Sequence, residues 1–314
     1  MLVLGSLKLD VVVQLSPAID LQLDSAYHVV PISYRLGGTA GTFLTAASPV
    51  FGGVSVIAAL GHDQLGRSIL AYLAELNVTS ALEYNSVANG VVVSLRVGDH
   101  STGRRTMLAS EASPHRALSA THVTANRELI EGADAMVCDT YFLTAHQSSA
   151  ALLAALKIAS NAGVQAVLDL VPHSMALSWT WGDLQPYVGL ASTVVAEART
   201  IVSLTEQHWP IPEMSTNDLV RRALKYARAQ SNATWLIRYG FANIGSVSRL
   251  DPDGTTTEYS TLLTRSPDHW GLGDRLLVSS QPPRHRLPRR SSYRRQHIVY
   301  RGEIVVVGCC RCCA

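Results

Sequence analysis

The segment from Asp268 to Asp274 places the residue types needed for phosphoryl transfer in a very small space. Its last four residues read Gly-Leu-Gly-Asp, so a carboxylate directly follows a glycine-rich turn. Glycines let the backbone come close to an anion, and the free N–H groups at a helix start attract negative charge. Asp274 would then be a general base that accepts the proton of a substrate hydroxyl. The amides of Gly271, Leu272 and Gly273 would hold the phosphate that is transferred. An ordinary Gly/Asp turn is the alternative interpretation of so short a pattern.

A second glycine-rich region lies more than 200 residues upstream. Residues 35–42 read Arg-Leu-Gly-Gly-Thr-Ala-Gly-Thr, and residues 59–67 read Ala-Leu-Gly-His-Asp-Gln-Leu-Gly-Arg. Together with residues 268–274, these segments resemble the two signatures of the PfkB/ribokinase family of carbohydrate kinases. His269 and Leu272 depart from the second signature. The resemblance extends over roughly residues 1 to 277, and two signatures in the right order are far more specific than either one alone.

The resemblance implies a substrate site built from four residues near the N-terminus. Asp10 falls where the family uses an aspartate to hold sugar hydroxyls, and a carboxylate can accept two such hydrogens at once. Gly37 and Gly38 fall where the backbone passes under the sugar, because a side chain there would collide with the ligand. Thr42 occupies the position of an asparagine in many relatives and can offer only one short hydroxyl. A turn residue for Asp10 and a plain helix start for the glycine pair are the structural alternatives.

For the nucleotide, the resemblance implies ATP and Mg²⁺ as cofactors. The family places an Asn-x-x-Glu motif after the strand at 193–195 to organise magnesium, and this chain reads Ala-Glu-Ala-Arg at 196–199. Glu197 is therefore only a weak metal candidate, with a surface-helix carboxylate as the alternative, and Arg199 would repel a cation. Arg238 and Gly240 lie where relatives have a Thr-x-Gly turn that contacts the nucleotide. Arg238 would pair either with a phosphate or with a structural carboxylate.

Composition and pattern predict an α/β enzyme domain. The chain has 314 residues, of which 47% are hydrophobic and 16% are charged, so it can bury a large core. Strand-like runs alternate with helical spacing from residue 135 to residue 239, which predicts a mainly parallel sheet with helices on both faces. The expected strands include residues 91–97, 105–109, 135–138, 166–171, 193–196 and 234–239, and the expected helices include 147–161 and 216–229. The resemblance implies the same architecture: a ribokinase-like three-layer α/β/α sandwich with a small β lid drawn from about residues 11–34 and 91–109. We therefore predict one kinase domain over residues 1–278.

Residues 279–314 differ from the rest and form a predicted tail rich in Arg, Pro and Cys. From residue 275 onward there are nine arginines and one acidic residue, Glu303, whereas residues 1–274 carry a net charge of −6. The basic cluster with Tyr293 would suit a nucleic-acid-binding arm. The abrupt change inside a signature motif instead favours unselected sequence from a frame change or abnormal splice, which would be disordered or non-native. Four of the five cysteines crowd into the last six residues, and their interleaved spacing makes a poor zinc site.

The sequence therefore predicts ATP-dependent phosphorylation of a hydroxyl of a sugar or nucleoside. The alternative is a catalytically silent kinase-fold protein that binds a sugar-like ligand or regulates, because Arg199 and the missing helices after Asp274 weaken the nucleotide site. We expect a small-molecule partner, no membrane partner, no nucleic-acid partner beyond what the basic tail alone would bind, and a homodimer formed through the lid strands. No run of about 18 apolar residues occurs. The cysteine-poor body suits a reducing cytoplasm.

Overall fold

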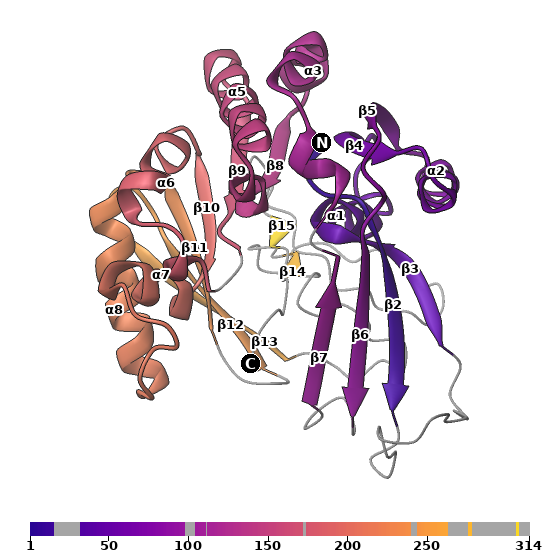
Figure 1. Ribbon diagram of the computed structural model, residues 1–314. Helices are drawn as coiled ribbons and strands as arrows, with labels where there is room; N and C mark the ends of the chain where they lie inside the picture. Colours follow the sequence, from indigo (N-terminus) through magenta and orange to yellow (C-terminus); the bar gives the residue numbers. More distant parts are fainter. Residues whose placement is uncertain are drawn as a thin grey trace, which may run out of the picture.

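A computed structural model describes residues 1–15, 32–97, 104–110, 112–171, 174–239, 244–262, 276–277 and 306–307. The strands are β1 (Leu2–Leu4), β2 (Lys8–Leu15), β3 (Ser33–Gly37), β4 (Ser55–Gly61), β5 (Thr79–Asn85), β6 (Val91–Val97), β7 (Arg104–Ala109), β8 (Ala135–Asp139), β9 (Gln165–Asp169), β10 (Thr193–Glu197), β11 (Thr234–Tyr239), β12 (Ile244–Leu250), β13 (Thr256–Leu262), β14 (Leu276–Leu277) and β15 (Val306–Val307). The helices are α1 (Gly38–Ala47), α2 (Gln64–Glu75), α3 (Ala120–Ala125), α4 (Arg127–Glu131), α5 (His146–Ala162), α6 (Trp181–Val188), α7 (Ala198–Glu206) and α8 (Thr216–Gln230). Figure 1 shows their arrangement.

The main sheet has nine strands in the order β13-β12-β11-β10-β9-β8-β1-β4-β5. Seven of them are parallel, and β12 and β13 add an antiparallel hairpin at one edge. All five residues of β8 are buried, as expected for a strand with helices over both faces. The strands from β11 to β5 in this order are all parallel, so their carboxyl ends lie along the same edge of the sheet.

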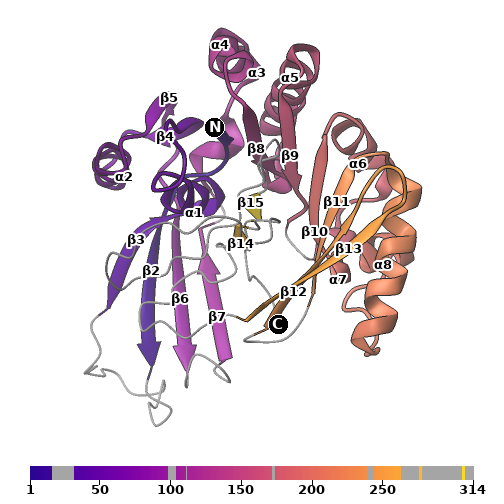
Figure 2. The ribbon, with the colours of Figure 1, turned by 180° about the vertical axis from the view of Figure 1, so that it is seen from behind.

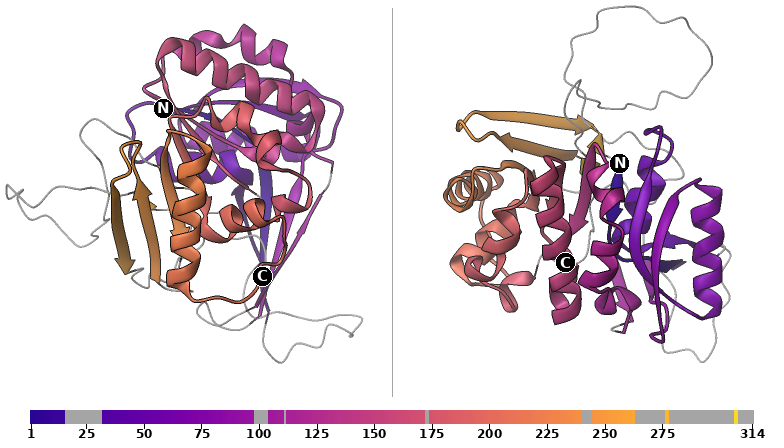
Figure 3. Two further views of the ribbon diagram at one scale, coloured as in Figure 1. Left: turned by 90° about the vertical axis from the view of Figure 1, so that its left-hand side faces the viewer. Right: turned by 90° about the horizontal axis from the view of Figure 1, so that it is seen from above.

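Helices cover both faces of this sheet and create two separate cores. Leu2 and Leu4 pack into a core with residues of α3 to α8, whereas Val3 points the other way into a core with α1 and α2. This alternation follows from the period of two along a strand. The second core continues across the neighbouring strands as Val137, Val167, Val195, Leu236 and Val247. Figure 2 shows the molecule from behind, and Figure 3 shows the layers from the side and from above.

A second sheet of four strands, in the order β3-β2-β6-β7, extends away from the main one. β2 is parallel to β6 and antiparallel to β3, and β6 and β7 are antiparallel. The predicted lid is thereby confirmed, although it begins at Lys8 rather than at residue 11 and includes β3 up to Gly37.

Most of the expected elements lie within a few residues of their predicted bounds. The helix predicted at 147–161 is α5, and the strands predicted at 91–97 and 105–109 are β6 and β7. The three-layer α/β sandwich with a mainly parallel sheet and a small lid is confirmed. The predicted domain boundary at residue 278 and nearly all of the predicted tail lie outside the described residues, so both stay predictions.

Candidate functional site

Asp10 lies on the lid strand β2, on the side of the strand that also carries Lys8. It pairs in register with Arg35 of β3 and Val92 of β6. The Arg35 Nη2 group donates to Asp10 Oδ2 at 3.4 Å, and the Asp10 side chain keeps 16% of its surface exposed. A carboxylate in this setting is held in place by a cation and still offers acceptor capacity to a ligand.

Gly37 and Gly38 join the lid to α1, and a side chain at either position would overlap neighbouring atoms. A Cβ at Gly37 would overlap the carboxyl group of Asp10, so the missing side chain makes room for that carboxylate. Gly38 has a φ of +75°, and a Cβ there would overlap the carbonyl oxygen of Ser6. The two glycines therefore bring Asp10 next to the first turn of α1. Thr42 lies on α1 one turn after Gly38 and is half-buried.

A hydrogen-bond network anchors the start of α1 to the main sheet. The Thr39 hydroxyl donates to Asp139 Oδ2 at 2.5 Å. Thr39 N donates to Ser6 Oγ, Ser6 N donates to Thr39 Oγ1, and Ala40 N donates to the Ser6 carbonyl. The segment between β1 and β2 and the first turn of α1 are thus tied to the carboxyl end of β8.

Asp139 is the last residue of β8, and its carboxyl group is buried. Its Oδ1 accepts a hydrogen bond from Tyr141 N at 2.8 Å. Burial raises the pKa of Asp139 to about 6, while the bonds from Thr39 and Tyr141 and the charge of Lys8 act in the opposite direction. Asp139 is therefore a carboxyl group whose ionisation falls near neutral pH.

The charge of Lys8 acts on both Asp139 and His115. Burial, together with the charges of Lys8 and Arg116, lowers the pKa of His115 to about 3. The ring is therefore neutral at physiological pH, and its Nδ1 lies 2.9 Å from Ser113 Oγ. A neutral His115 cannot supply a charge for an anionic ligand, which leaves Lys8 as the cation beside Asp139.

The turn at 61–66, which belongs to the first glycine-rich region, has a structural role. Asp63 caps α2 by accepting from Gly66 N at 2.8 Å. It also accepts from the backbone and side-chain nitrogens of Asn89, and Asn89 in turn holds the backbone of Gly61 at the end of β4. Desolvation of the carboxylate acts to raise the pKa of Asp63, but the hydrogen bonds outweigh it, so the pKa is lowered. The aspartate and glycines of this turn fix β4, α2 and the loop before β6 to one another.

The candidate nucleotide residues lie at the same edge of the sheet, on neighbouring strands. Glu197 ends β10, precedes α7 and is half-buried, while Arg199 is exposed on the first turn of α7. The Arg238 guanidinium on β11 donates to Asp169 Oδ1 at 3.1 Å, and both side chains are buried. The structural ion pair that the sequence left open for Arg238 is thus present, and its phosphate contact stays a prediction.

A magnesium ion held by the protein does not fit the side chains at this edge. Within the described ranges, no group of three His, Cys, Asp or Glu side chains is arranged to hold a metal. Asp169 is already bonded to the guanidinium of Arg238. On β10, Asp169 aligns with Val195, and Glu197 lies two residues further along that strand.

The segment predicted to be catalytic lies outside the described residues. This applies to Asp274, Gly271, Leu272 and Gly273, and also to Gly240. The structure brings Asp10 and Gly37 together, and their role in binding a substrate stays a prediction. Glu197 lies in register with Arg238 on the adjacent strand.

Three side chains of this region were not singled out from the sequence: Thr39, Asp139 and Asp169. Asp139 follows the apolar run at 135–138, and Asp169 ends the strand predicted at 166–171. An acidic residue at the carboxyl end of a predicted parallel strand is the signal that identifies both, because ligands bind at that edge of such sheets. Thr39 carries no comparable signal.

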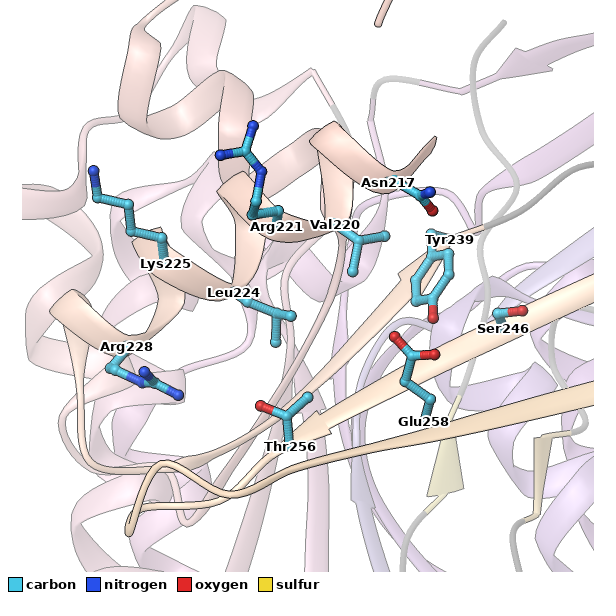
Figure 4. Close-up of a pocket in the computed structure, with 10 residues that line it drawn as sticks. All are labelled: Asn217, Val220, Arg221, Leu224, Lys225, Arg228, Tyr239, Ser246, Thr256 and Glu258. Atoms are coloured by element: carbon cyan, nitrogen blue, oxygen red, sulfur yellow. The ribbon is translucent and has the colours of Figure 1, made fainter. Parts of the chain in front are cut away.

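A separate pocket of about 690 Å³ lies between α8 and the β12–β13 hairpin (Figure 4). Its basic side chains are Arg221, Lys225 and Arg228, but Arg221 is paired with Asp218 and Arg228 donates to a backbone carbonyl. Tyr239 lines the pocket and points to the face opposite Arg238, because side chains alternate along a strand. The pocket is therefore on the far side of the sheet from Asp10 and the glycine pair.

In the part of the chain that the structure describes, none of the helices has the length and apolar character needed to span a bilayer. The structure resembles solved kinases of small molecules. An adenosine kinase from Sinorhizobium meliloti superposes with a TM-score of 0.66 at 13% identity, covering 84% of this chain and 80% of the other. A ribokinase from Giardia lamblia gives 0.62 at 13% identity, covering 82% and 73%. A phosphofructokinase-2 variant from Escherichia coli gives 0.58 at 16% identity, covering 87% and 83%.

At these identities the likeness shows a shared ribokinase-like fold. A search of curated proteins found no match. The profile described as "pfkB family carbohydrate kinase" matches residues 3–240, which include the lid, the glycine pair, Asp139 and the Asp169–Arg238 pair. The chain belongs to the pfkB family of carbohydrate kinases.

Proposed function

We propose that this protein transfers the γ-phosphate of ATP to a hydroxyl group of a sugar or nucleoside in a cytoplasmic compartment. The observation that carries this proposal is the junction of lid and sheet, where the absent side chain of Gly37 makes room for the Asp10 carboxylate beside the start of α1. A hydroxyl-rich ligand suits this site, since a carboxylate accepts hydrogens from adjacent hydroxyls and backbone groups complete the contacts.

In the proposed mechanism, Asp10 holds the acceptor's hydroxyls and Gly37 and Gly38 let it approach the backbone. Asp274 accepts the proton of the attacking hydroxyl, and the amides of Gly271, Leu272 and Gly273 stabilise the charge on the transferred group. Phosphoryl transfer needs mainly positioning and charge neutralisation, so this small set of groups is chemically sufficient. Arg238 and Gly240 are proposed as nucleotide contacts. Mg²⁺ would arrive bound to ATP, with Glu197 as the weak candidate for a further contact.

A direct assay tests this function. The purified protein is incubated with ATP and Mg²⁺ and with a pentose, a hexose, an acid sugar and a nucleoside in turn. We expect ADP release that depends on one class of acceptor, together with a new phosphate ester in the phosphorus NMR spectrum. ADP release that is the same with and without every acceptor would contradict a kinase of small hydroxyl compounds.

The acceptor contact predicts the effect of removing the Asp10 carboxylate. Asp10→Ala is expected to weaken binding of the acceptor by about 1.5–3 kcal/mol, because a hydrogen bond to a charged group is lost. Calorimetric titration measures this change without requiring turnover. Asp253→Ala makes the same substitution in the turn between β12 and β13 and should leave affinity unchanged. Equal affinity of the Asp10 variant and the unmodified protein would remove Asp10 from the site.

A second candidate function is a catalytically silent protein that binds a sugar-like ligand or regulates. The Asp169–Arg238 ion pair favours it, because at the edge where a nucleotide would bind the charge of Arg238 is already paired with a carboxylate of the protein. Acceptor binding in calorimetry with no phosphate ester in the assay above would select this function over the first.

A further inference from the structure

A row of charged side chains crosses the carboxyl edge of the main sheet, one from each of β8 to β11. Asp139 aligns with Asp169 across β8 and β9, and Glu197 aligns with Arg238 across β10 and β11. Val195 aligns with Asp169 and lies two residues before Glu197, so all four charged residues are on the same face. This is the face from which α1 reaches Asp139. The row contains three carboxyl groups and one guanidinium.

Within this row, Asp169 and Arg238 form a buried ion pair. The Arg238 Nη2 atom lies 3.1 Å from Asp169 Oδ1, and the two side chains expose 8% and 4% of their surface. A buried carboxylate is costly unless a cation and hydrogen bonds compensate it, and the planar guanidinium supplies both. Asp169 is thus neutralised by the protein itself.

Three carboxyl groups in one row would attract a divalent cation if no positive charge of the protein lay among them. Magnesium prefers carboxylate oxygens together with water in a compact octahedral arrangement. The guanidinium instead lies against the Asp169 carboxylate, and its fixed positive charge repels an incoming cation. Arg199, two residues after Glu197 in the chain, adds a second positive charge.

We propose that Arg238 takes the place of a protein-held divalent cation at this edge, so that the free protein has no magnesium site there. Asp169 is the positioning residue that holds the guanidinium between β9 and β11. In this arrangement Arg238 faces a phosphate-bearing ligand as a built-in cation, and divalent metal enters only with that ligand. The statement about the phosphate-bearing ligand rests on the proposed function, whereas the statement about the free protein does not.

Binding of Mn²⁺ alone, followed by electron paramagnetic resonance in the absence of nucleotide, tests the metal statement. The unmodified protein is expected to bind Mn²⁺ only weakly and without saturation. Arg238→Gln removes the charge from beside Asp169 and should tighten Mn²⁺ binding by about tenfold or more, because the net negative charge of a site sets its affinity. The double variant Arg238→Gln/Asp169→Asn should lose that gain.

Two controls separate the site from general effects of charge. Arg238→Lys keeps the positive charge and should not gain metal binding. Arg222→Gln breaks the more exposed ion pair between Arg222 and Glu206. It therefore measures how much Mn²⁺ binding changes when an arginine is removed from any acidic partner. Melting curves establish that each variant is folded.

Saturable Mn²⁺ binding by the unmodified protein that disappears in Asp169→Asn would overturn the proposal, and this comparison does not require Arg238→Gln to fold. A folded Arg238→Gln variant with no gain over Arg222→Gln would overturn it as well. No nucleotide or acceptor is present in these measurements. Failure of the kinase assay therefore leaves their interpretation unchanged, and the two ideas can fail separately.

Discussion

Asp274→Asn is expected to lower the turnover number by about 10²–10⁴-fold while leaving affinity for the acceptor nearly unchanged. The carboxamide has nearly the shape of the carboxylate but cannot accept the proton of the attacking hydroxyl. The loss therefore falls on the transition state and not on binding of the substrate. Steady-state kinetics with the acceptor found in the assay measure the turnover number, and calorimetry measures affinity.

Asp268→Asn is the matched control for this change, because Asp268 begins the same seven-residue segment but is not the proposed base. It should retain most of the turnover. An Asp274→Asn variant as active as the unmodified protein would remove Asp274 from the mechanism. An equal loss in both variants would indicate that the whole segment has been perturbed.

Asp139→Asn is expected to raise the free energy of unfolding by about 1–3 kcal/mol at pH 7.5. Burial raises the pKa of Asp139 from 3.8 to about 6, so the native state holds a proton that the unfolded state releases between these values. Stability of the unmodified protein therefore falls as pH rises through this interval, by up to about 3 kcal/mol. An amide at position 139 avoids this cost. Its oxygen can still accept from Tyr141 N, and its NH2 group then faces the Thr39 hydroxyl, to which it can donate.

Urea unfolding between pH 4 and pH 7.5 measures this effect. The advantage of the variant should disappear towards pH 4, where the carboxyl group is increasingly protonated in both states. Asp183→Asn is a control of opposite sign, because hydrogen bonds from Thr180 lower the pKa of that capping carboxylate. A variant at position 139 that is less stable by the same amount at every pH would show that Asp139 acts only through its hydrogen bonds.

The sequence predicted the architecture well because periodicity is a local property. Runs of four to six residues were enough to locate the central strands, helical spacing over residues 147–161 located α5, and glycine spacing located the start of α1. The β12–β13 hairpin was not predicted. Gly245 and several Ser and Thr residues weaken its apolar alternation, and a hairpin of this kind is stabilised by pairing with β11.

The site was predicted less completely, since it depends on contacts between distant residues. Thr39 and Asp139 are 100 residues apart, and they meet because α1 packs on the face of the sheet to which Val137 and Asp139 point. Arg238 had two interpretations in the sequence, and only the register of β9, β10 and β11 places Asp169 within reach of it. No local pattern contains that information.

The central position of β1 also determines when during synthesis the sheet can be completed. Its residues pair with Ser55–Ile57 on one side and with Met136–Cys138 on the other. β1 therefore acquires its second neighbour only after well over a hundred further residues have been made. Until then one side of β1 is an open edge, and open edges of apolar strands invite pairing with other chains. Such long-range closure is slow, so we expect the nascent chain to spend its most aggregation-prone interval before β8 emerges.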